Sequence, residues 1–189
     1  MINKMKDIVR GFTLIETLVA VLLLTSAIAG PLTIAAKGLS SVLVARDQMV
    51  AFYLAQDGVE YVRFVRDTNK LAGGSSNWLS GDGTAQTKDL TACTGSTGCY
   101  IDPSTNVIVA CPAVSSGGCP TLAKHDGGGG QKYFTYSSSD PVTPQRFVRT
   151  IIIASASAGE AVLTVAVSWR AQSGVTRVIT VRENIFDWQ

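Results

Sequence analysis

Histidine is almost absent from this chain, and its cysteines lack the close spacing that zinc sites use. His125 is the single histidine, and the four cysteines follow one another as C-x5-C, C-x11-C and C-x7-C. Structural zinc sites usually include a C-x2-C pair, so zinc is only an alternative use of these cysteines. Asp82 and Asp126 lie in glycine-rich stretches and could offer oxygens to calcium, but the ligand spacing of a known calcium loop is missing. We therefore expect no metal and no cofactor.

The chain also lacks the G-x-S-x-G motif that positions a nucleophilic serine in many hydrolases. His125, Asp126 and the serines from Ser137 to Ser139 supply the residue types of a catalytic triad. The glycine run from Gly127 to Gly130 would hold His125 loosely, which does not suit a catalytic base. We expect no catalytic residue and no enzyme activity.

Charge is scarce and nearly balanced along the sequence. The chain has 16 lysines and arginines against 14 acidic residues, a net charge of +2. Lys4, Lys6 and Arg10, set against Asp7, account for this excess, so the remaining chain is near neutral. This composition shows no global nucleic-acid footprint, although folding could still gather a local basic patch.

Between Phe12 and Ala36 the chain has a single charged residue, Glu16. These 25 residues would form a helix of about 37 Å, enough to cross a hydrocarbon core of about 30 Å once. A carboxylate in such a run costs roughly 2 to 4 kcal/mol on insertion scales, which favours a function for Glu16. The alternative is a carboxylate at the membrane surface, in the first turn of a helix, where the helix dipole favours it.

The sequence GFTLIE, with Gly11 and Phe12 after a basic leader and Glu16 four residues later, closely resembles the processing site of type IV prepilins and type II secretion pseudopilins. The resemblance implies that a prepilin peptidase cleaves after Gly11 and methylates the new amine of Phe12. It also implies that Glu16 is needed for assembly. A buried carboxylate needs a cation, and the Phe12 ammonium of a neighbouring subunit could supply it and set the axial register.

Two other interpretations of the N-terminus stay open. Ala27-Ile28-Ala29 fits the A-x-A pattern of a secretory signal, and cleavage before Gly30 would release an exported domain. Glu16 and the helical pattern beyond Gly30 argue against it. The other interpretation is an uncleaved membrane anchor. A lipoprotein is not expected, because no cysteine lies near the apolar run.

The helical pattern continues from Gly38 to Asn69, but there it becomes amphipathic. Pro31, preceded by Gly30, should kink the helix, and Gly58 should weaken it slightly. We expect exposed ion pairs of Arg63 with Glu60 and Asp67. The residues expected to form the core-facing stripe are Leu39, Leu43, Val50, Leu54, Tyr61 and Val65. The aromatic residues expected to serve packing are Phe52, Tyr53, Tyr61 and Phe64.

The segment from Leu71 to Pro144 is rich in glycine, serine and threonine and should be mostly loop. The fragments expected to form short strands are Trp78-Leu79, Tyr100-Ile101, Val107 to Ala110 and Tyr133 to Tyr136. Four cysteines can pair in three ways, and sequence alone does not choose. We favour disulfides between Cys93 and Cys99 and between Cys111 and Cys119, because each closes a small turn containing glycine and serine. If the basic leader stays inside the cell, these cysteines face an oxidising compartment.

The last part of the chain contains three β-branched runs that predict an antiparallel meander, Arg146 to Ser155, Ala161 to Arg170 and Val175 to Asn184. In the middle run Leu163, Val165, Val167 and Trp169 should face the helix. Trp169 and Trp188 are expected in the core or at the sheet edge.

These patterns predict an α+β fold in five segments: a leader (1–11), a membrane or filament-core helix (12–36), the amphipathic half of that helix (37–70), a loop region with four cysteines (71–144) and an antiparallel sheet (145–189). Together with the resemblance, they imply a single-pass membrane protein with a cytoplasmic N-terminus that enters an extracellular or periplasmic filament, most like a minor pilin. The implied partners are other pilin subunits, the peptidase, the membrane assembly or secretion machinery, and lipid before assembly. A secretion pseudopilin, or an exported or anchored binding domain or adhesin, are the alternatives.

Overall fold

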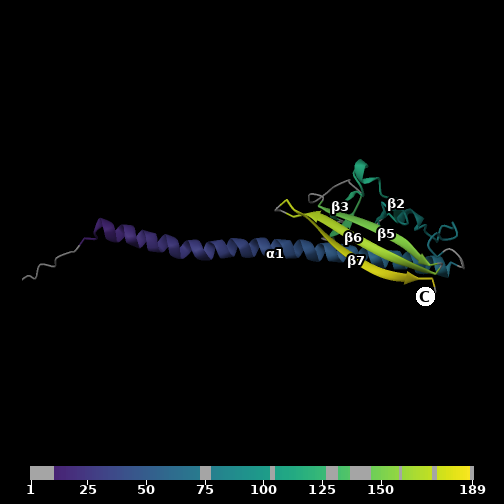
Figure 1. Ribbon diagram of the computed structural model, residues 1–189, viewed down its shortest axis with the longest axis horizontal. Coiled ribbons are helices and arrows are strands. Elements are labelled where there is room, and N and C mark those ends of the chain that lie inside the picture. Colours follow the sequence, from purple (N-terminus) through teal and green to yellow (C-terminus); the bar gives the residue numbers. More distant parts are fainter. Residues whose placement is uncertain are drawn as a thin grey trace, which may run out of the picture. The chain divides into compact units, whose positions relative to one another are not determined.

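The computed structural model describes residues 11–72, 78–102, 105–126, 132–136, 146–157, 159–171 and 174–187. The described part contains one α-helix, two short 3-10 helices and seven strands, an α+β fold as expected (Figure 1). The chain divides into two compact units, Met1–Ala45 and Arg46–Gln189, and each is described separately. We call the second unit the head.

Helix α1 (Leu14–Leu71) has 58 residues and begins and ends within two residues of the predicted limits. It continues through Pro31, so the proline does not end it, and the kink expected there stays a prediction. Since proline has no N–H, the Ala27 carbonyl lacks its usual helical donor.

The buried stripe of α1 in the head differs from the stripe that the spacing of large apolar residues predicted. Leu54 and Val65 are buried as expected, and Val50 and Tyr61 pack at the margin of the core, but Leu39 is 64% exposed. Small and β-branched residues provide most of the contact face instead. The buried residues of α1 are Ala51, Leu54, Ala55, Gly58, Val59, Val62, Val65, Arg66 and Asn69.

Gly58 has a packing role that was not predicted, and Arg63 has one partner that differs from those expected. A Cβ atom at Gly58 would lie 3.1 Å from Val165 Cγ1, so the glycine allows close packing of helix on sheet. Arg63 pairs with Glu60 as predicted, but its second partner is Glu183 of the sheet. The expected pair with Asp67 is wrong.

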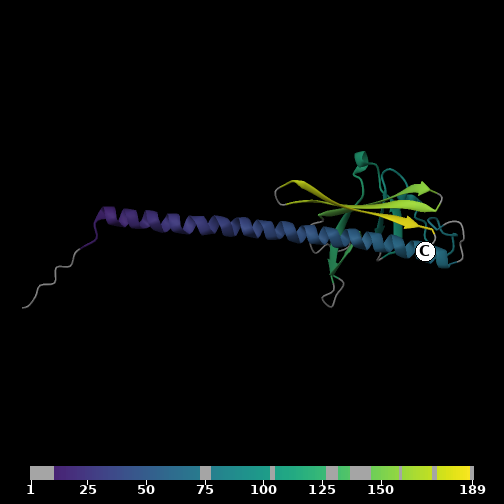
Figure 2. The same cartoon turned by 60° about the horizontal axis from the view of Figure 1, so that its bottom comes forward.

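Three long antiparallel strands, β5 (Phe147–Ser157), β6 (Glu160–Arg170) and β7 (Thr176–Phe186), confirm the predicted meander. Every second residue of β6 is buried, including Leu163, Val165, Val167 and Trp169, as the alternation predicted. In the head, α1 lies against one face of this sheet (Figure 2). Trp188 falls outside the described residues.

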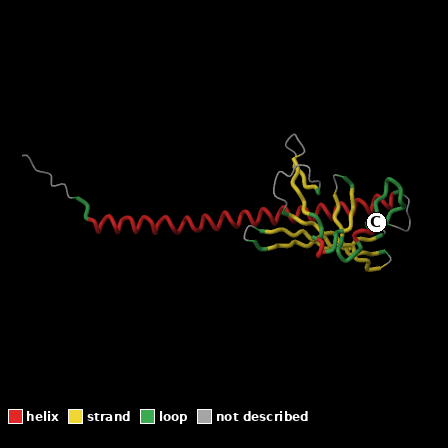
Figure 3. The backbone as a smooth tube through the Cα atoms, turned by 90° about the horizontal axis from the view of Figure 1, so that it is seen from above, coloured by secondary structure: helices red, strands yellow, loops and turns green. Residues whose placement is uncertain are grey.

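Four shorter strands extend the sheet beyond β5 (Figure 3). β1 (Cys99–Asp102) pairs with β2 (Val107–Ala110) and with β5, while β3 (Thr121–Asp126) pairs with β4 (Lys132–Thr135) and with β5. The strand fragments expected around Tyr100, Val107 and Tyr133 are therefore confirmed. Trp78-Leu79 forms a turn instead, and β3 was not predicted. The 3-10 helices η1 (Thr91–Cys93) and η2 (Val114–Ser116) complete the central region.

Candidate functional site

The N-terminal end of α1 places Glu16 in its first turn. Thr13 caps the helix: its backbone carbonyl accepts hydrogen bonds from the N–H groups of Glu16 (3.1 Å) and Thr17 (3.2 Å). The Thr13 hydroxyl also accepts from Glu16 N at 3.4 Å. Thr-x-x-Glu is the capping-box pattern, a signal that the sequence analysis did not use. Gly11 and Phe12 precede the cap directly.

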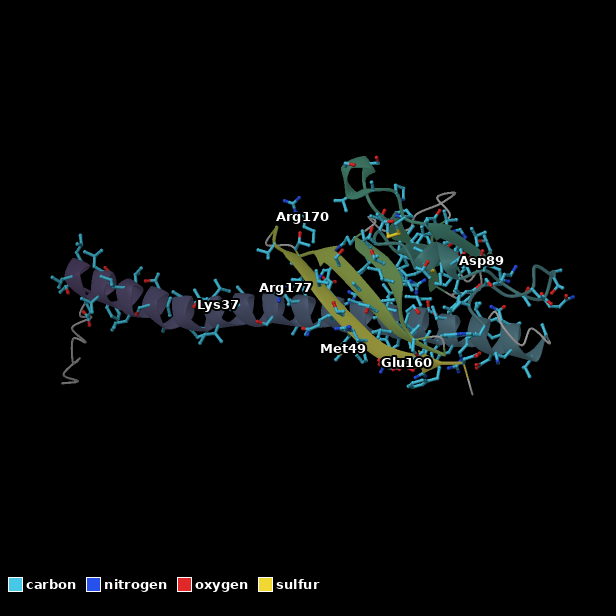
Figure 4. The ribbon with its side chains drawn as sticks, turned by 45° about the vertical axis from the view of Figure 1, so that its right-hand side comes forward. Lys37, Met49, Asp89, Glu160, Arg170 and Arg177 are labelled. Carbon is cyan, nitrogen blue, oxygen red and sulfur yellow. A yellow bond between two sulfur atoms is a disulfide. The ribbon has the colours of Figure 1, made fainter. Side chains whose placement is uncertain are left out.

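The large apolar side chains of this first unit from Phe12 to Val42 are exposed. Phe12 is 81% exposed, and side chains stand out around the helix on every side (Figure 4). An 18-residue window of α1 reaches a mean hydropathy of 2.2 with none of it buried, so by length and composition this helix could cross a membrane. The large apolar residues exposed here are Phe12, Leu14, Ile15, Leu18, Val19, Val21, Leu22, Leu23, Leu24, Ile28, Leu32, Ile34, Leu39 and Val42.

Four hydroxyl groups of the apolar run donate hydrogen bonds to carbonyls of the same helix. Thr17 donates to the Leu14 carbonyl at 2.8 Å, and Thr33 donates to the Gly30 carbonyl at 2.7 Å. Thr25 and Ser26 make equivalent bonds one turn back. Such bonds let a hydroxyl enter an apolar environment without an unsatisfied donor. Among the described residues the Glu16 carboxylate has no hydrogen bond or ion pair, so it is the polar side chain of this segment that still needs a partner.

The exposed apolar surface of α1 continues into the head on the helix face turned away from the sheet. Met49, Phe52, Tyr53 and Phe64 are exposed there, and Tyr53 reaches 68%. Of the aromatics predicted to serve packing, Tyr61 alone reaches the core of the head, while the rings of Phe52 and Tyr53 contact each other and the ring of Phe64 contacts Tyr61. Tyr61 packs at the core margin and donates a hydrogen bond to Asn106 Oδ1 at 2.8 Å. Burial, with a smaller contribution from Asp102, raises the pKa of Tyr61.

Disulfide bonds join Cys93 to Cys99 and Cys111 to Cys119, the pairing that the short intervening turns favoured. All four sulfurs are used in these bonds, so they do not offer thiolate ligands for zinc. No group of three or more potential metal ligands occurs within the part of the chain that the structure describes.

His125 and Asp82, two other residues singled out from the sequence, have structural partners in the described part of the chain. The His125 ring packs against Tyr133, with ring centroids 5.2 Å apart, in the β3–β4 hairpin. Residues 137–139 and 127–130 lie outside the described ranges, so the catalytic grouping and the Asp126 calcium ligand are not tested. Asp82 Oδ1 accepts hydrogen bonds from Thr84 N (2.9 Å) and Thr87 Oγ1 (2.7 Å), an arrangement that holds its own loop.

Arg149 is the residue of the head that sequence reasoning missed. Its side chain is 1% exposed and reaches across from β5 to the carbonyls of Leu54 (3.1 Å) and Ile101 (2.8 Å) and to Asp57 Oδ2 (2.5 Å). It therefore joins α1, β1 and β5. Beside it, burial raises the pKa of the Tyr136 phenol, an effect that the positive charge of Arg149 opposes.

Comparison with known proteins does not extend this description: no protein-family model, curated protein or solved structure matches the chain.

Proposed function

We propose that this chain is a subunit of a type IV pilus or a related secretion filament, of the minor-pilin kind. It enters the membrane through the apolar part of α1, is cleaved after Gly11 and assembles through that helix. The observation that carries the proposal is the unpartnered Glu16 carboxylate in an otherwise apolar, exposed helix, four residues after Phe12.

The physical argument concerns what happens when this helix is buried among other copies. Apolar side chains on all faces give favourable contacts in many axial positions, so they do not fix one arrangement. A buried carboxylate without a cation costs about 3 to 5 kcal/mol. The free amine that cleavage creates on Phe12 is a cation at a fixed place on every copy. Pairing it with Glu16 of a neighbour removes this cost in one register only.

The exposed aromatic face of α1 in the head supports the same assembly. Met49, Phe52, Tyr53 and Phe64 extend the apolar surface of the helix beyond the part that could cross a membrane. A soluble monomer gains nothing from exposing these side chains, whereas a filament can bury them between subunits.

Substitutions of Glu16 test the proposal and separate its charge from helix capping. Glu16→Ala and Glu16→Gln should both be processed and inserted in the membrane but poorly incorporated into filaments. Glutamine keeps the size of the side chain and its hydrogen-bonding capacity and removes only the charge. Thr17→Val is the matched control, because the Thr17 hydroxyl bonds only to the Leu14 carbonyl of its own helix.

Incorporation is measured as the fraction of subunit in sheared filaments relative to total membrane protein. Thr17→Val should incorporate normally. Normal incorporation of Glu16→Gln would show that the charge of Glu16 is not required and would overturn its pairing with Phe12, and normal incorporation of Glu16→Ala would overturn its role in assembly altogether.

A further inference from the structure

One end of the head gathers four arginines from three separate parts of the chain. Arg46 is the first residue of the head, and the next residue, Asp47, pairs with Arg146 at the start of β5. Strand register brings the other two arginines to the same sheet end: Phe147 pairs with Trp169, next to Arg170, and Trp169 pairs with Arg177. We call Arg46, Arg146, Arg170 and Arg177 the basic end.

The positive charges of three of these arginines have no ionic partner among the described residues. Arg46, Arg170 and Arg177 are exposed, and none makes an ion pair or hydrogen bond with any residue that the structure describes. Asp47, the acid that the ion pair places here, is already engaged by Arg146. Figure 4 shows Arg170 and Arg177 at one end of the head and Asp89 and Glu160 towards the other.

Around Arg170 and Arg177 the basic end exposes Val175, just before β7, and Val178, within it, whereas the nearby Trp169 is buried. Single-stranded nucleic acid is usually held by aromatic stacking combined with positive charge. Arginines interleaved with exposed valines instead suit a lipid bilayer, which has anionic headgroups at its surface and an apolar layer beneath them.

The position of the basic end along the chain makes a bilayer accessible. Arg46 follows Ala36, the last residue of the apolar run, by ten helical residues, a rise of about 15 Å. A headgroup layer extends about 5 to 7 Å beyond the hydrocarbon core, so this short tether keeps the head near the bilayer that holds the apolar run.

We propose that the basic end docks on the anionic phospholipid headgroups of the bilayer that holds the apolar part of α1, before the subunit enters a filament. The partner is defined by its chemistry: phosphodiester anions that accept arginine N–H groups, above an apolar layer that receives Val175 and Val178. This inference rests on the proposed function only in requiring that α1 is inserted in a membrane. Release of the basic end from lipid would then accompany assembly.

A spin label at the basic end measures docking directly in the full chain. Because all four native cysteines are in disulfides, Val175→Cys supplies a unique thiol, and Glu160→Cys supplies a control label at the opposite end of the head. The protein is placed in nanodiscs of zwitterionic lipid, or of the same lipid mixed with phosphatidylglycerol. Collision with a water-soluble nickel complex reports exposure of each label to solvent.

Phosphatidylglycerol should protect the Val175 label from the nickel complex, and high salt should reverse this protection. The Glu160 label should not change. Each of Arg170→Gln and Arg177→Gln should lower the docking equilibrium constant about fivefold, the contribution of one cation near an anionic surface. Arg182→Gln is the matched control: Arg182 is an exposed arginine of β7 that lies outside the basic end, and its loss should leave docking unchanged.

Equal exposure of the Val175 label in both lipids would overturn the proposal. Protection that depends on protein concentration and not on phosphatidylglycerol would assign the basic end to a second copy of the chain and would overturn lipid docking as well. Protection by added single-stranded DNA in zwitterionic nanodiscs alone would assign it to nucleic acid instead. Failure of the chain to remain in the nanodisc would count against membrane insertion, and so against the proposed function. Retention in the nanodisc and protection of the Val175 label are measured separately, so the two proposals can fail independently.

Discussion

The two parts of helix α1 make opposite use of the same secondary structure. In the head, Ala51, Ala55, Val62 and Val65 are completely buried against the sheet. Before Ala45 every large apolar side chain from Phe12 to Val42 is exposed. The head buries the apolar side chains of its part of α1 against its own sheet. The apolar side chains of the first part could be buried only against an apolar partner outside the described chain.

The sequence of each part explains this division. In the head, buried residues recur on one stripe of α1, and the rest of its surface combines charged residues with the exposed Met49, Phe52, Tyr53 and Phe64. In the first unit apolar residues surround the whole helix, the pattern of a helix buried on all sides or crossing a membrane. Glu16 is the exception, which makes it the residue through which the partner can be specific.

The largest expected effect falls on the buried charge of the head. Arg149→Ala should destabilise the head by about 3 to 5 kcal/mol, because two buried carbonyls lose their donor and a cavity opens between α1 and β5. Arg182→Ala, at an exposed position of β7, should change the stability by less than about 0.5 kcal/mol. Urea unfolding followed by near-ultraviolet circular dichroism measures both, and equal stabilities would contradict the role given to Arg149.

Removing a disulfide should loosen the central region while sparing the contact between α1 and the long strands. Replacing Cys93 and Cys99 together by alanine should cost about 2 to 3 kcal/mol, since the bridge closes a short loop. Faster amide exchange is expected in β1 and β2, with β5 to β7 little changed. Ser96→Ala, inside the same loop, is the control; faster exchange across β6 and β7 in the double variant would show that the central region also supports the sheet.

The same substitution in the two parts of α1 should have opposite consequences. Gly58→Leu should destabilise the head by about 1 to 3 kcal/mol, because its side chain meets Val165, Arg149 and Ile151 at close range. Gly38→Leu has nothing within 4 Å and should favour the helix by about 0.8 kcal/mol without affecting the head. Thermal unfolding of both variants compares them directly, and similar losses at the two positions would remove the distinction between the two parts.

The smallest expected effect is a pH dependence in the loop after α1. Hydrogen bonds from Thr84 first, and then from Thr87, lower the pKa of Asp82 from 3.8 to about 2. Because the folded pKa is the lower one, this interaction stabilises the loop fully above the unfolded pKa and is lost as the pH falls through about 2. Thr87→Val should raise the pKa towards 3.8 in a carboxyl NMR titration, and an unchanged pKa would exclude the Thr87 contribution.

Local patterns were sufficient for the parts of the fold that depend on local chemistry. β-Branched alternation predicted β5 to β7, and the cysteine spacing favoured the observed disulfides. The predicted buried stripe of α1 was partly wrong because it was based on the spacing of large apolar residues. The sheet approaches the helix closely, and only small residues such as Ala51, Ala55 and Gly58 fit at that distance. β3 was missed because its sequence, TLAKHD, has little β-branched character and forms a strand only beside β5.

Arg149 shows more clearly what local sequence patterns do not predict. It alternates with Phe147, Ile151 and Ile153 along β5, but Val148 and Ile152 on the other face are also apolar, so the sequence alone did not indicate its direction. Its partners are the Leu54 carbonyl, Asp57 and the Ile101 carbonyl, which lie 48 or more residues away and become neighbours only on folding. The N-terminal site could be predicted from the sequence because Gly11, Phe12 and Glu16 lie within six residues. The capping role of Thr13 was not predicted.

The central claim is that the exposed part of α1 is made ready for assembly by cleavage before Phe12. The intact mass of the protein purified from membranes of cells that express a prepilin peptidase tests it most directly. The account predicts a chain that lacks residues 1 to 11 and carries one additional methyl group. A chain that begins at Gly30, or one that keeps its first eleven residues, would contradict it.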